Sequence, residues 1–408
     1  MSTITLTHPA TDEDWSKLLA FSKLVHPGDD VNLFVHLYRE RPDLTPDDHA
    51  MLVEEDQVIA TCSLLPHHHY FGDSELEVGE IGLMGTHPDR RLEGHADRLL
   101  NHWLNVAKDR GYPYLYLYGI PRFYEKFGFA YAAPFHAFPS LRMSREALDP
   151  VMSPYRVRPL NAADVPVLAE LYDMANCRTP MAEVRSPEYW AYRLSHTRGG
   201  GFGWWVAVDE NNQPHGYAWA NLPEARLREV VCADDEAARA ILQWMKWELT
   251  ERKLPEFAAQ VPLDQRFATV ARRMGAYTAD PHCLFPGNWG AMIKVLRLRP
   301  ILEAMRPRLE ERLLDSRYAR AEVMVTLVMG DEAVSLRYGS SHKLVVAPGS
   351  VGHEIHLPPA AWGPVLTGYK ACDEIPGVEL TEPEKHLMRT LFAGGHPYVW
   401  DLEQSDAL

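Results

Sequence analysis

Apolar and polar residues alternate with helical and strand-like periods along the whole chain. Near the start, Thr11 and Asp14 form a capping-box pattern ahead of apolar residues at helical spacing, which predicts a first helix. A second helix is expected from Val31 to Arg41. Strand-like runs follow at residues 50–53, 58–65 and 69–71. An acidic, turn-like stretch joins the first two runs, so they are expected to form a hairpin.

One central passage has the pattern of a strand, a crossover helix and a second strand. Ile81–Thr86 is predicted as a strand, and Gly94–Arg110 as a helix with one apolar face. Gly111 has the position of a C-terminal helix stop, Tyr114–Tyr118 is the next predicted strand, and Pro121 opens a short helix. Such a unit is typical of a mixed α/β sheet whose faces are covered by helices.

Two breaks divide the chain into three segments. A proline cluster between residues 134 and 159 marks the first, and the sequence Phe285–Asn288 marks the second. After the first break, a strand and a capped helix repeat the opening pattern, which indicates an internal duplication. The third segment alternates helices and strands and resembles a small α+β domain. We therefore expect domains at residues 1–150, 151–290 and 291–408.

Composition narrows the class of protein. The formal net charge is −15, which argues against a nucleic-acid partner, because such proteins present a basic surface to phosphates. The same charge suits a cationic small substrate. The five cysteines are scattered, as expected for a reducing cytoplasm. The sequence has no signal-peptide pattern and no apolar run long enough to cross a bilayer, so no membrane partner is expected.

The loop before the predicted crossover helix has the chemistry of an anion site. It contains the pattern P-x-x-R-x-x-G-x-A, with Arg91, Gly94 and Ala96 between a strand and a helix. A helix N-terminus presents unpaired amides and a positive dipole end to an anion. Gly94 and Ala96 let a pyrophosphate approach the main chain, and Arg91 can add charge-assisted hydrogen bonds.

These residues resemble the acetyl-CoA signature of the GNAT acetyltransferases. The downstream Tyr124–Phe129, sequence YEKFGF, is similar to the Y-x-x-F-G-F motif of that family. The three-part layout further resembles the Eis (enhanced intracellular survival) branch. In that branch a GNAT domain is followed by a degenerate GNAT domain and a sterol carrier protein-like domain. The implied fold class is α/β (α+β), with tandem GNAT folds, each a mixed and mostly antiparallel sheet, and a C-terminal α+β domain.

The resemblance implies specific roles for residues of the first domain. The main chain of Met84, Gly85 and Thr86 would bind the pantetheine arm where their strand parts from its neighbour. Residues around the loop would wrap the pyrophosphate of acetyl-CoA: Arg91, Leu92, Glu93, Gly94, His95, Ala96 and Asp97. Gly119 and Ile120 would contact the thioester end, although the family's polar residue after that strand is absent. Glu93 is a second departure, because a carboxylate repels a pyrophosphate.

Two groups are implied for proton transfer. Tyr124 would donate a proton to the departing CoA thiolate. Because a tyrosine titrates near 10 and a thiol near 8.5, either Tyr124 is acidified or it mainly stabilises the sulfur anion by hydrogen bonding; alternatively, it is a packing aromatic. In the Eis branch the terminal carboxylate reaches the site. Here that group belongs to Leu408, which either holds the amine or lies in a frayed terminus.

Other patterns in the sequence predict no further chemistry. His67-His68-His69 lacks carboxylate or cysteine partners at metal-ligand spacing, so no metal is expected. Strand alternation places His67 and His69 on one face. In the second segment, the stretch before the helix at Glu236–Arg252 lacks R-x-x-G-x-G/A and is acidic, so this copy is not expected to bind CoA.

Two functions from different classes remain open. The first is an acetyl-CoA-dependent N-acetyltransferase that acts on a cationic amine (polyamine, aminoglycoside, lysine-like or aryl amine) by direct transfer in a ternary complex. The second is a catalytically idle GNAT-like binding protein whose C-terminal domain holds an apolar ligand. The scattered cysteines favour a cytoplasmic protein. The resemblance implies a homo-oligomer, since hexamers are known in that branch.

Overall fold

A computed structural model describes residues 3–27, 36–120, 122–134, 140–195, 201–279, 290–392 and 394. It divides the chain into two compact units. The first unit consists of Met1–Ala133, Thr179–Val184 and Trp289–Leu408, and the second of Pro134–Arg178 and Arg185–Asn288. Each unit is built around a seven-stranded sheet, and the first unit contains a further sheet of four strands.

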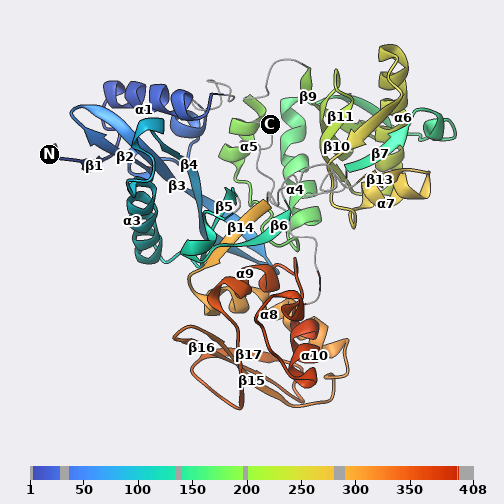
Figure 1. Ribbon diagram of the computed structural model, residues 1–408. Coiled ribbons are helices and arrows are strands. Elements are labelled where there is room, and N and C mark those ends of the chain that lie inside the picture. Colours follow the sequence, from blue (N-terminus) through green and yellow to red (C-terminus); the bar gives the residue numbers. More distant parts are fainter. Residues whose placement is uncertain are drawn as a thin grey trace. The chain divides into compact units, whose positions relative to one another are not determined.

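The first sheet carries the motifs of the first segment. Its order is β1 (Thr5–Thr7), β2 (His49–Glu54), β3 (Gln57–Phe71), β4 (Ser74–Thr86), β5 (Tyr114–Gly119), β14 (Gly290–Val295) and β6 (Ala130–Pro134). The helices α1 (Asp12–Val25) and α3 (His95–Asp109) cover opposite faces of its first strands (Figure 1). The strands β4 and β5 run parallel and α3 connects them, so the predicted crossover unit is confirmed.

Local signals set the ends of both helices as expected. Thr11 accepts a hydrogen bond from the Asp14 amide at 3.2 Å, and the Asp14 carboxylate accepts one from the Thr11 amide at 2.9 Å. Gly94 precedes α3 with φ 82°, and Gly111 follows it with φ 79°, a region that favours glycine. Of the helix expected at Val31–Arg41, only a π-helix at His36–Glu40 lies within the described residues.

The strand β3 is longer than the sequence predicts. Residues 66–68 lie between two predicted strand-like runs, yet β3 is continuous from Gln57 to Phe71. The proline is tolerated because the ladder with β2 ends at the pair His49↔Ser63, so one edge of β3 is not paired with β2 at Pro66. The hairpin of β2 and β3 is antiparallel, as predicted.

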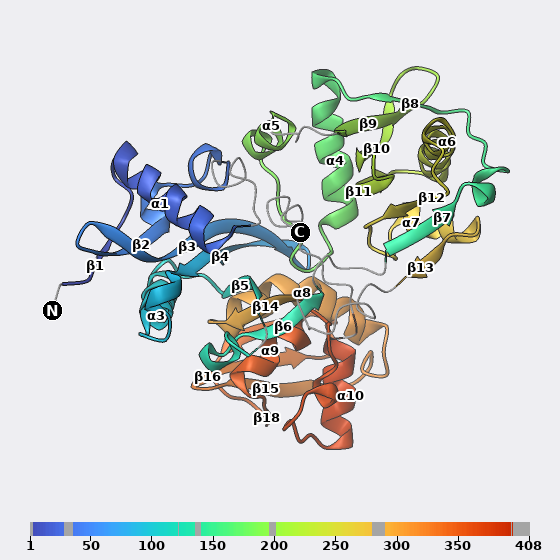
Figure 2. The same cartoon turned by 45° about the horizontal axis from the view of Figure 1, so that its top comes forward.

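The second unit repeats this architecture. Its sheet has the order β8 (Arg156–Pro159), β9 (Phe202–Val208), β10 (Pro214–Asn221), β11 (Arg226–Cys232), β12 (Glu256–Ala259), β7 (Ser140–Ser144) and β13 (Tyr277–Ala279). The helices α4 (Val165–Asn176) and α5 (Pro187–Ser195) lie on one face, and α6 (Asp235–Arg252) and α7 (Arg266–Arg273) on the other (Figure 2). The strands β11 and β12 are parallel, as β4 and β5 are.

Each seven-stranded sheet contains one strand that comes from outside the main run of its own strands in the chain. Both sheets have five strands in chain order, then a strand from elsewhere, then a sixth strand. In the first sheet the inserted strand is β14, which pairs antiparallel with β5. In the second sheet it is β7, which pairs with β12 and β13. The strands therefore cross the expected boundaries at 150/151 and 290/291, because β7 precedes the first boundary and β14 begins at the second.

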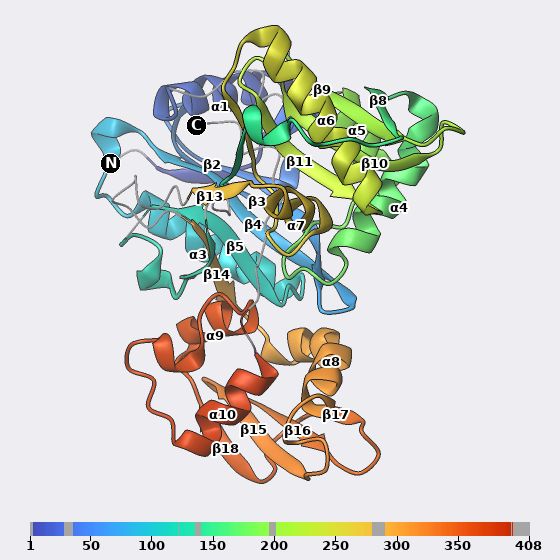
Figure 3. The same cartoon turned by 90° about the vertical axis from the view of Figure 1, so that its right-hand side faces the viewer.

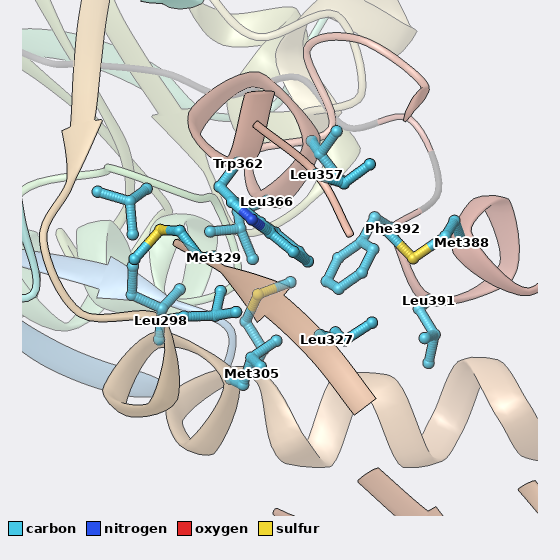
Figure 4. Close-up of a cluster of buried hydrophobic side chains, with 14 of the residues drawn as sticks. Leu298, Met305, Leu327, Met329, Leu357, Trp362, Leu366, Met388, Leu391 and Phe392 are labelled. Carbon is cyan, nitrogen blue, oxygen red and sulfur yellow. The ribbon is translucent and has the colours of Figure 1, made fainter. Parts of the chain in front are cut away.

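The third sheet belongs to the first unit. Its order is β17 (Leu344–Pro348), β16 (Glu332–Tyr338), β15 (Val323–Met329) and β18 (His353–His356), and the helices α8 (Leu298–Leu314), α9 (Pro359–Leu366) and α10 (Glu382–Leu391) lie on one side of it (Figure 3). Trp362 of α9 and Phe392 pack edge to face in its core, with ring centroids 6.3 Å apart (Figure 4). The expected α/β (α+β) class is confirmed.

The core of the third sheet continues into the first sheet. One cluster of buried side chains includes Leu302 and Leu327 around the third sheet, and Tyr116 of β5 and Ile293 of β14. If a β-carbon were added to Gly363 of α9, it would lie 3.2 Å from Ile293, which shows how closely this helix packs on β14. These two parts of the first unit therefore share one hydrophobic core.

None of the described helices combines the length and the apolar composition that a bilayer-spanning helix requires.

Candidate acetyl-CoA site

The strands β4 and β5 part at the level where the pantetheine arm was expected. Their ladder contains only the pairs Gly79↔Leu115 and Glu80↔Tyr116. Leu83 then interrupts β4 with φ 51°, and the register with β3 shifts at this bulge. The Leu83 carbonyl accepts a hydrogen bond from Thr61 Oγ1 at 3.2 Å, which holds the bulge in place.

The three expected pantetheine residues lie beyond this bulge. Gly85 and Thr86 pair with Thr61 and Ala60 of β3, so only their other edge faces the opening toward β5. Met84 is part of the irregular stretch between the two registers. The family resemblance predicts that β4 and β5 part at this level. It does not predict the bulge at Leu83, because the residue with the positive φ is not a glycine.

The loop before α3 has the unpaired amides that an anion site requires. Within the described part of the chain, the main-chain amides from Gly94 to Asp97 donate no hydrogen bond, and the first intrahelical bond runs from the Arg98 amide to the Gly94 carbonyl at 3.0 Å. A β-carbon on Gly94 would meet no atom within 4 Å, so the space beside Gly94 is open. The geometry fits a pyrophosphate at the helix N-terminus.

The carboxylate of Glu93, which was expected to repel a pyrophosphate, is paired with two neighbouring side chains. Its carboxylate accepts hydrogen bonds from Arg90 Nε at 2.9 Å and from His95 Nε2 at 3.1 Å. The bond from Arg90 holds the pKa of Glu93 below its usual value. Arg90 also pairs with Glu54. The expected repulsion of a pyrophosphate by Glu93 is therefore reduced, while Arg91 and Leu92 are exposed at the same loop.

Tyr124 packs against the far end of the opening. Its ring contacts Phe123 and Phe129, and its hydroxyl donates a weak hydrogen bond to Met84 Sδ at 3.7 Å. Burial raises the pKa of Tyr124 well above its usual value, with a smaller contribution from Cys62. The raised pKa favours the alternative in which the hydroxyl stays protonated and acts as a hydrogen-bond donor.

Gly119 and Ile120 end β5 next to Tyr124. A β-carbon on Gly119 would lie 2.5 Å from Met292 Sδ and 2.9 Å from Tyr124 Cδ2, so a larger residue would displace the tyrosine ring. Ile120 is half exposed. The Tyr124 ring packs so closely on Gly119 that a polar side chain has no room at this position. This packing explains why the polar residue expected from the family is absent at Gly119.

The remaining predicted residues lie outside the described part of the chain or away from the candidate acetyl-CoA site. Leu408, Pro121 and Phe285–Asn288 lie outside the described residues. In the second unit, Asp234 caps the N-terminus of α6, and its carboxylate accepts a hydrogen bond from the Ala237 amide at 2.8 Å. That capped, acidic helix end favours the expectation that this copy does not bind CoA. The described residues hold no group of three or more His, Cys, Asp or Glu side chains suited to a metal.

Sequence reasoning missed a buried polar cluster on the other face of the first sheet. Strand alternation correctly placed His67 and His69 on one face, and both are buried. His67 Nδ1 lies 3.2 Å from Glu183 Oε1, and its Nε2 lies 3.1 Å from both Glu80 Oε2 and Arg41 Nη1. The Tyr116 hydroxyl donates to the same Glu80 oxygen at 3.2 Å. These partners are far from His67 in sequence, so no local motif indicates the cluster.

The cluster predicts a pH dependence of stability. Burial and the neighbouring Arg41 oppose protonation of His67, but the hydrogen bonds to Glu183 and Glu80 outweigh them and raise its pKa to about 9. Since an unfolded histidine titrates near 6.5, this group stabilises the fold fully below pH 6.5 and loses its contribution as the pH rises through about 9. The contribution is on the order of 3 kcal/mol.

Urea unfolding at pH 6.5 and pH 9.5 checks this expectation. The decrease in the free energy of unfolding between the two pH values should be smaller for His67→Gln than for the unchanged protein. His68→Gln is the control, because this neighbouring side chain is exposed on the opposite face. A decrease of equal size in both variants would contradict the assignment to His67.

Comparisons with known proteins agree with this geometry. Residues 7–132 match the acetyltransferase (GNAT) domain family. A GCN5-related N-acetyltransferase from Anabaena variabilis superposes with a TM-score of 0.73 at 17% identity, covering 97% of this chain and 98% of that chain. A probable N-acyltransferase of unknown function from Enterococcus faecalis gives 0.72 at 12% identity, with 97% and 98% covered. Eis1 from Mycobacterium abscessus gives 0.68 at 15% identity, with 97% and 99% covered.

At these identities the structural matches show that the whole-chain fold is shared. No curated protein sequence matches the chain. The family match covers the strands and the helix that form the opening between β4 and β5 and the loop before α3. Residues 7–132 match an acetyltransferase (GNAT) domain, and this match supports acyltransferase chemistry in that part of the chain.

Proposed function

We propose that the protein is an acetyl-CoA-dependent N-acetyltransferase that transfers the acetyl group directly to a cationic amine in a ternary complex. The observation that carries the proposal is the row of unpaired amides from Gly94 to Asp97, with open space beside Gly94. The second part of the proposed site is the opening between β4 and β5. The ladder between these strands ends at Glu80↔Tyr116, so Gly85 and Thr86 have no β5 partner.

The proposed binding mode assigns each expected residue a role. The main chain from Leu92 to Asp97 binds the pyrophosphate, and Arg91 adds a charge-assisted hydrogen bond. The pantetheine arm lies along the open edge of Met84, Gly85 and Thr86. Its thioester end then reaches Gly119 and Ile120, beside the ring of Tyr124.

The transfer itself needs few groups. The ammonium group first gives one proton to water, and the neutral nitrogen then attacks the thioester carbonyl. A C–N bond forms while the C–S bond breaks, and the nitrogen releases its second proton to water to give the neutral amide. The electron pair of the broken bond stays on sulfur, and the Tyr124 hydroxyl donates a hydrogen bond or its proton to the developing thiolate. The raised pKa of Tyr124 favours the hydrogen-bonding role, because full transfer from such a phenol to a thiolate is uphill.

The finer parts of the proposal rest on the family resemblance. They are an Eis-like layout, a sterol carrier protein-like domain around the third sheet, a carboxylate of Leu408 that holds the amine, and a homo-oligomer such as a hexamer. The proposed cytoplasmic location rests instead on the scattered cysteines. The competing function, an idle binding protein with an apolar ligand in the C-terminal domain, predicts no thiol release from acetyl-CoA with any amine.

Calorimetry with CoA and a thiol-release assay test the proposal. The protein should bind CoA and release the thiol faster with a polyamine, an aminoglycoside or an aryl amine than in buffer. Failure to bind CoA would overturn the proposed site. Binding without release for the whole amine panel would favour the idle binding protein.

Arg91 gives a sharper test of the pyrophosphate loop. Arg91→Ala is expected to weaken CoA binding about tenfold, or about 1.4 kcal/mol, because one charge-assisted hydrogen bond is lost. Arg98→Ala is the matched control, since Arg98 lies in the first turn of α3 and its guanidinium instead donates to the Ile4 carbonyl at 3.3 Å. Equal dissociation constants for CoA in the two variants would remove Arg91 from the site.

A further inference from the structure

We propose that the ammonium group of Lys126 binds the diphosphate of acetyl-CoA, in exchange for the Asp97 carboxylate with which it is paired. The inference rests on the proposed acetyl-CoA site and adds to it a side chain from the segment after β5. Lys126 would touch the cofactor, and Asp97 would compete with the phosphates for the lysine.

The first argument is the place of Lys126 beside the loop before α3. Lys126 Nζ lies 2.8 Å from Asp97 Oδ1. Asp97 is the third residue of α3, and its amide belongs to the row that donates no main-chain hydrogen bond within the described residues. The ammonium group thus contacts the side chain of a residue in that row. Since a lysine has a long and flexible stem, a phosphate held by these amides is within its reach.

The second argument is the way in which the lysine is held. Its Nζ lies 4.8 Å from the ring centroids of both Phe123 and Phe127, a distance at which an aromatic face attracts a cation. The turn that carries the lysine is fixed in its place, because the Phe127 carbonyl accepts a hydrogen bond from Lys294 Nζ at 2.6 Å. The two rings and the turn therefore direct the ammonium group toward α3.

The third argument is the supply of positive charge around the loop. The diphosphate of CoA carries a negative charge on each phosphate. Arg90 is paired with two glutamates, and the Arg98 guanidinium donates to a main-chain carbonyl of the N-terminal segment. These two cations are thus engaged elsewhere, whereas Lys126 is paired with a carboxylate of α3 itself. Together with Arg91, it would provide one cation for each phosphate.

The fourth argument is the exposure of the ion pair. The side chains of Lys126 and Asp97 are 49% and 47% exposed. An ion pair that remains half in water contributes little to stability, so breaking it costs little. A phosphate oxygen accepts a strong, charge-assisted hydrogen bond from an ammonium group. A diphosphate that also binds the row of amides can therefore take the place of the carboxylate.

Calorimetry with CoA and with 3′-dephospho-CoA tests the contact. Lys126→Gln is expected to raise the Kd for both ligands about tenfold, because both contain the diphosphate. Lys126→Arg keeps the charge and should stay within about threefold of the unchanged protein. Lys108→Gln is the matched control, since it removes an equal charge from an exposed side chain in the last turn of α3. The Kd of this control should stay within about twofold.

A second set of variants separates a phosphate contact from simple neutralisation of Asp97. Asp97→Asn removes the carboxylate and keeps the main-chain amide. When Lys126→Gln is added to Asp97→Asn, the Kd for CoA should still rise about fivefold or more, because the phosphate contact is lost. A lysine that only neutralises Asp97 has nothing to neutralise in this background. Equal Kd values for Asp97→Asn and the double variant would therefore overturn the inference.

The remaining outcomes also decide the question. A loss of affinity for CoA but not for 3′-dephospho-CoA would place the contact at the 3′-phosphate and overturn the diphosphate assignment. Equal losses for Lys126→Gln and Lys108→Gln would show a general effect of charge and overturn the contact. In all of these cases the proposed CoA site stands. If the unchanged protein binds no CoA, both the inference and the proposed function fall.

Discussion

Tyr124→Phe is expected to lower kcat at least tenfold and to leave CoA binding unchanged. A tenfold loss corresponds to about 1.4 kcal/mol of transition-state stabilisation, which one hydrogen bond to a developing thiolate can supply. Phenylalanine keeps the edge-on contacts with Phe123 and Phe129, whose ring centroids lie 4.8 and 6.1 Å from that of Tyr124. The expected loss therefore reports on the hydroxyl and not on the packing.

Steady-state thiol release and calorimetry with CoA measure this prediction. Tyr112→Phe is a suitable control, because this tyrosine is buried in the same hydrophobic cluster but its hydroxyl contacts Arg110 at 3.5 Å. The control should keep kcat within twofold. Equal turnover for Tyr124→Phe and the unchanged protein would reduce Tyr124 to a packing residue.

A chain that ends at residue 289 is expected not to fold into a CoA-binding domain, although it contains every motif of the GNAT match. Such a chain lacks β14, which separates β5 from β6 in the first sheet. Residues of β14 such as Met292 and Ile293 are almost completely buried. Their loss would expose the edge of β5 and open the core shared with the third sheet, and one exposed apolar strand edge is enough to promote aggregation.

Soluble yield, circular dichroism and CoA calorimetry measure the effect of this truncation. A chain that ends at Gly394 keeps every described helix and strand, and it should fold and bind CoA. The same control tests Leu408, since it removes the terminal carboxylate that was expected to hold the amine. A folded, CoA-binding chain of residues 1–289 would show that β14 is dispensable for the first sheet.

The sequence by itself determined the parts of this protein that depend on neighbouring residues. The helix α3 begins at His95 and ends at Asp109, within a residue of the prediction, because Gly94 and Gly111 flank an amphipathic stretch. The loop before it was recognised from a few positions, since a helix N-terminus that binds an anion needs small residues and free amides at fixed spacing. The α/β class followed from the same alternation of helical and strand periods.

Tertiary structure alone decided which strands share a sheet. β14 pairs with β5 from about 170 residues away, and nothing in the period of its apolar residues distinguishes it from a strand of its own segment. The cluster around His67 has the same origin, because Glu80 and Glu183 lie 13 and 116 residues from it. Pairing partners and buried charges depend on contacts between distant segments, and only the folded chain brings these segments together.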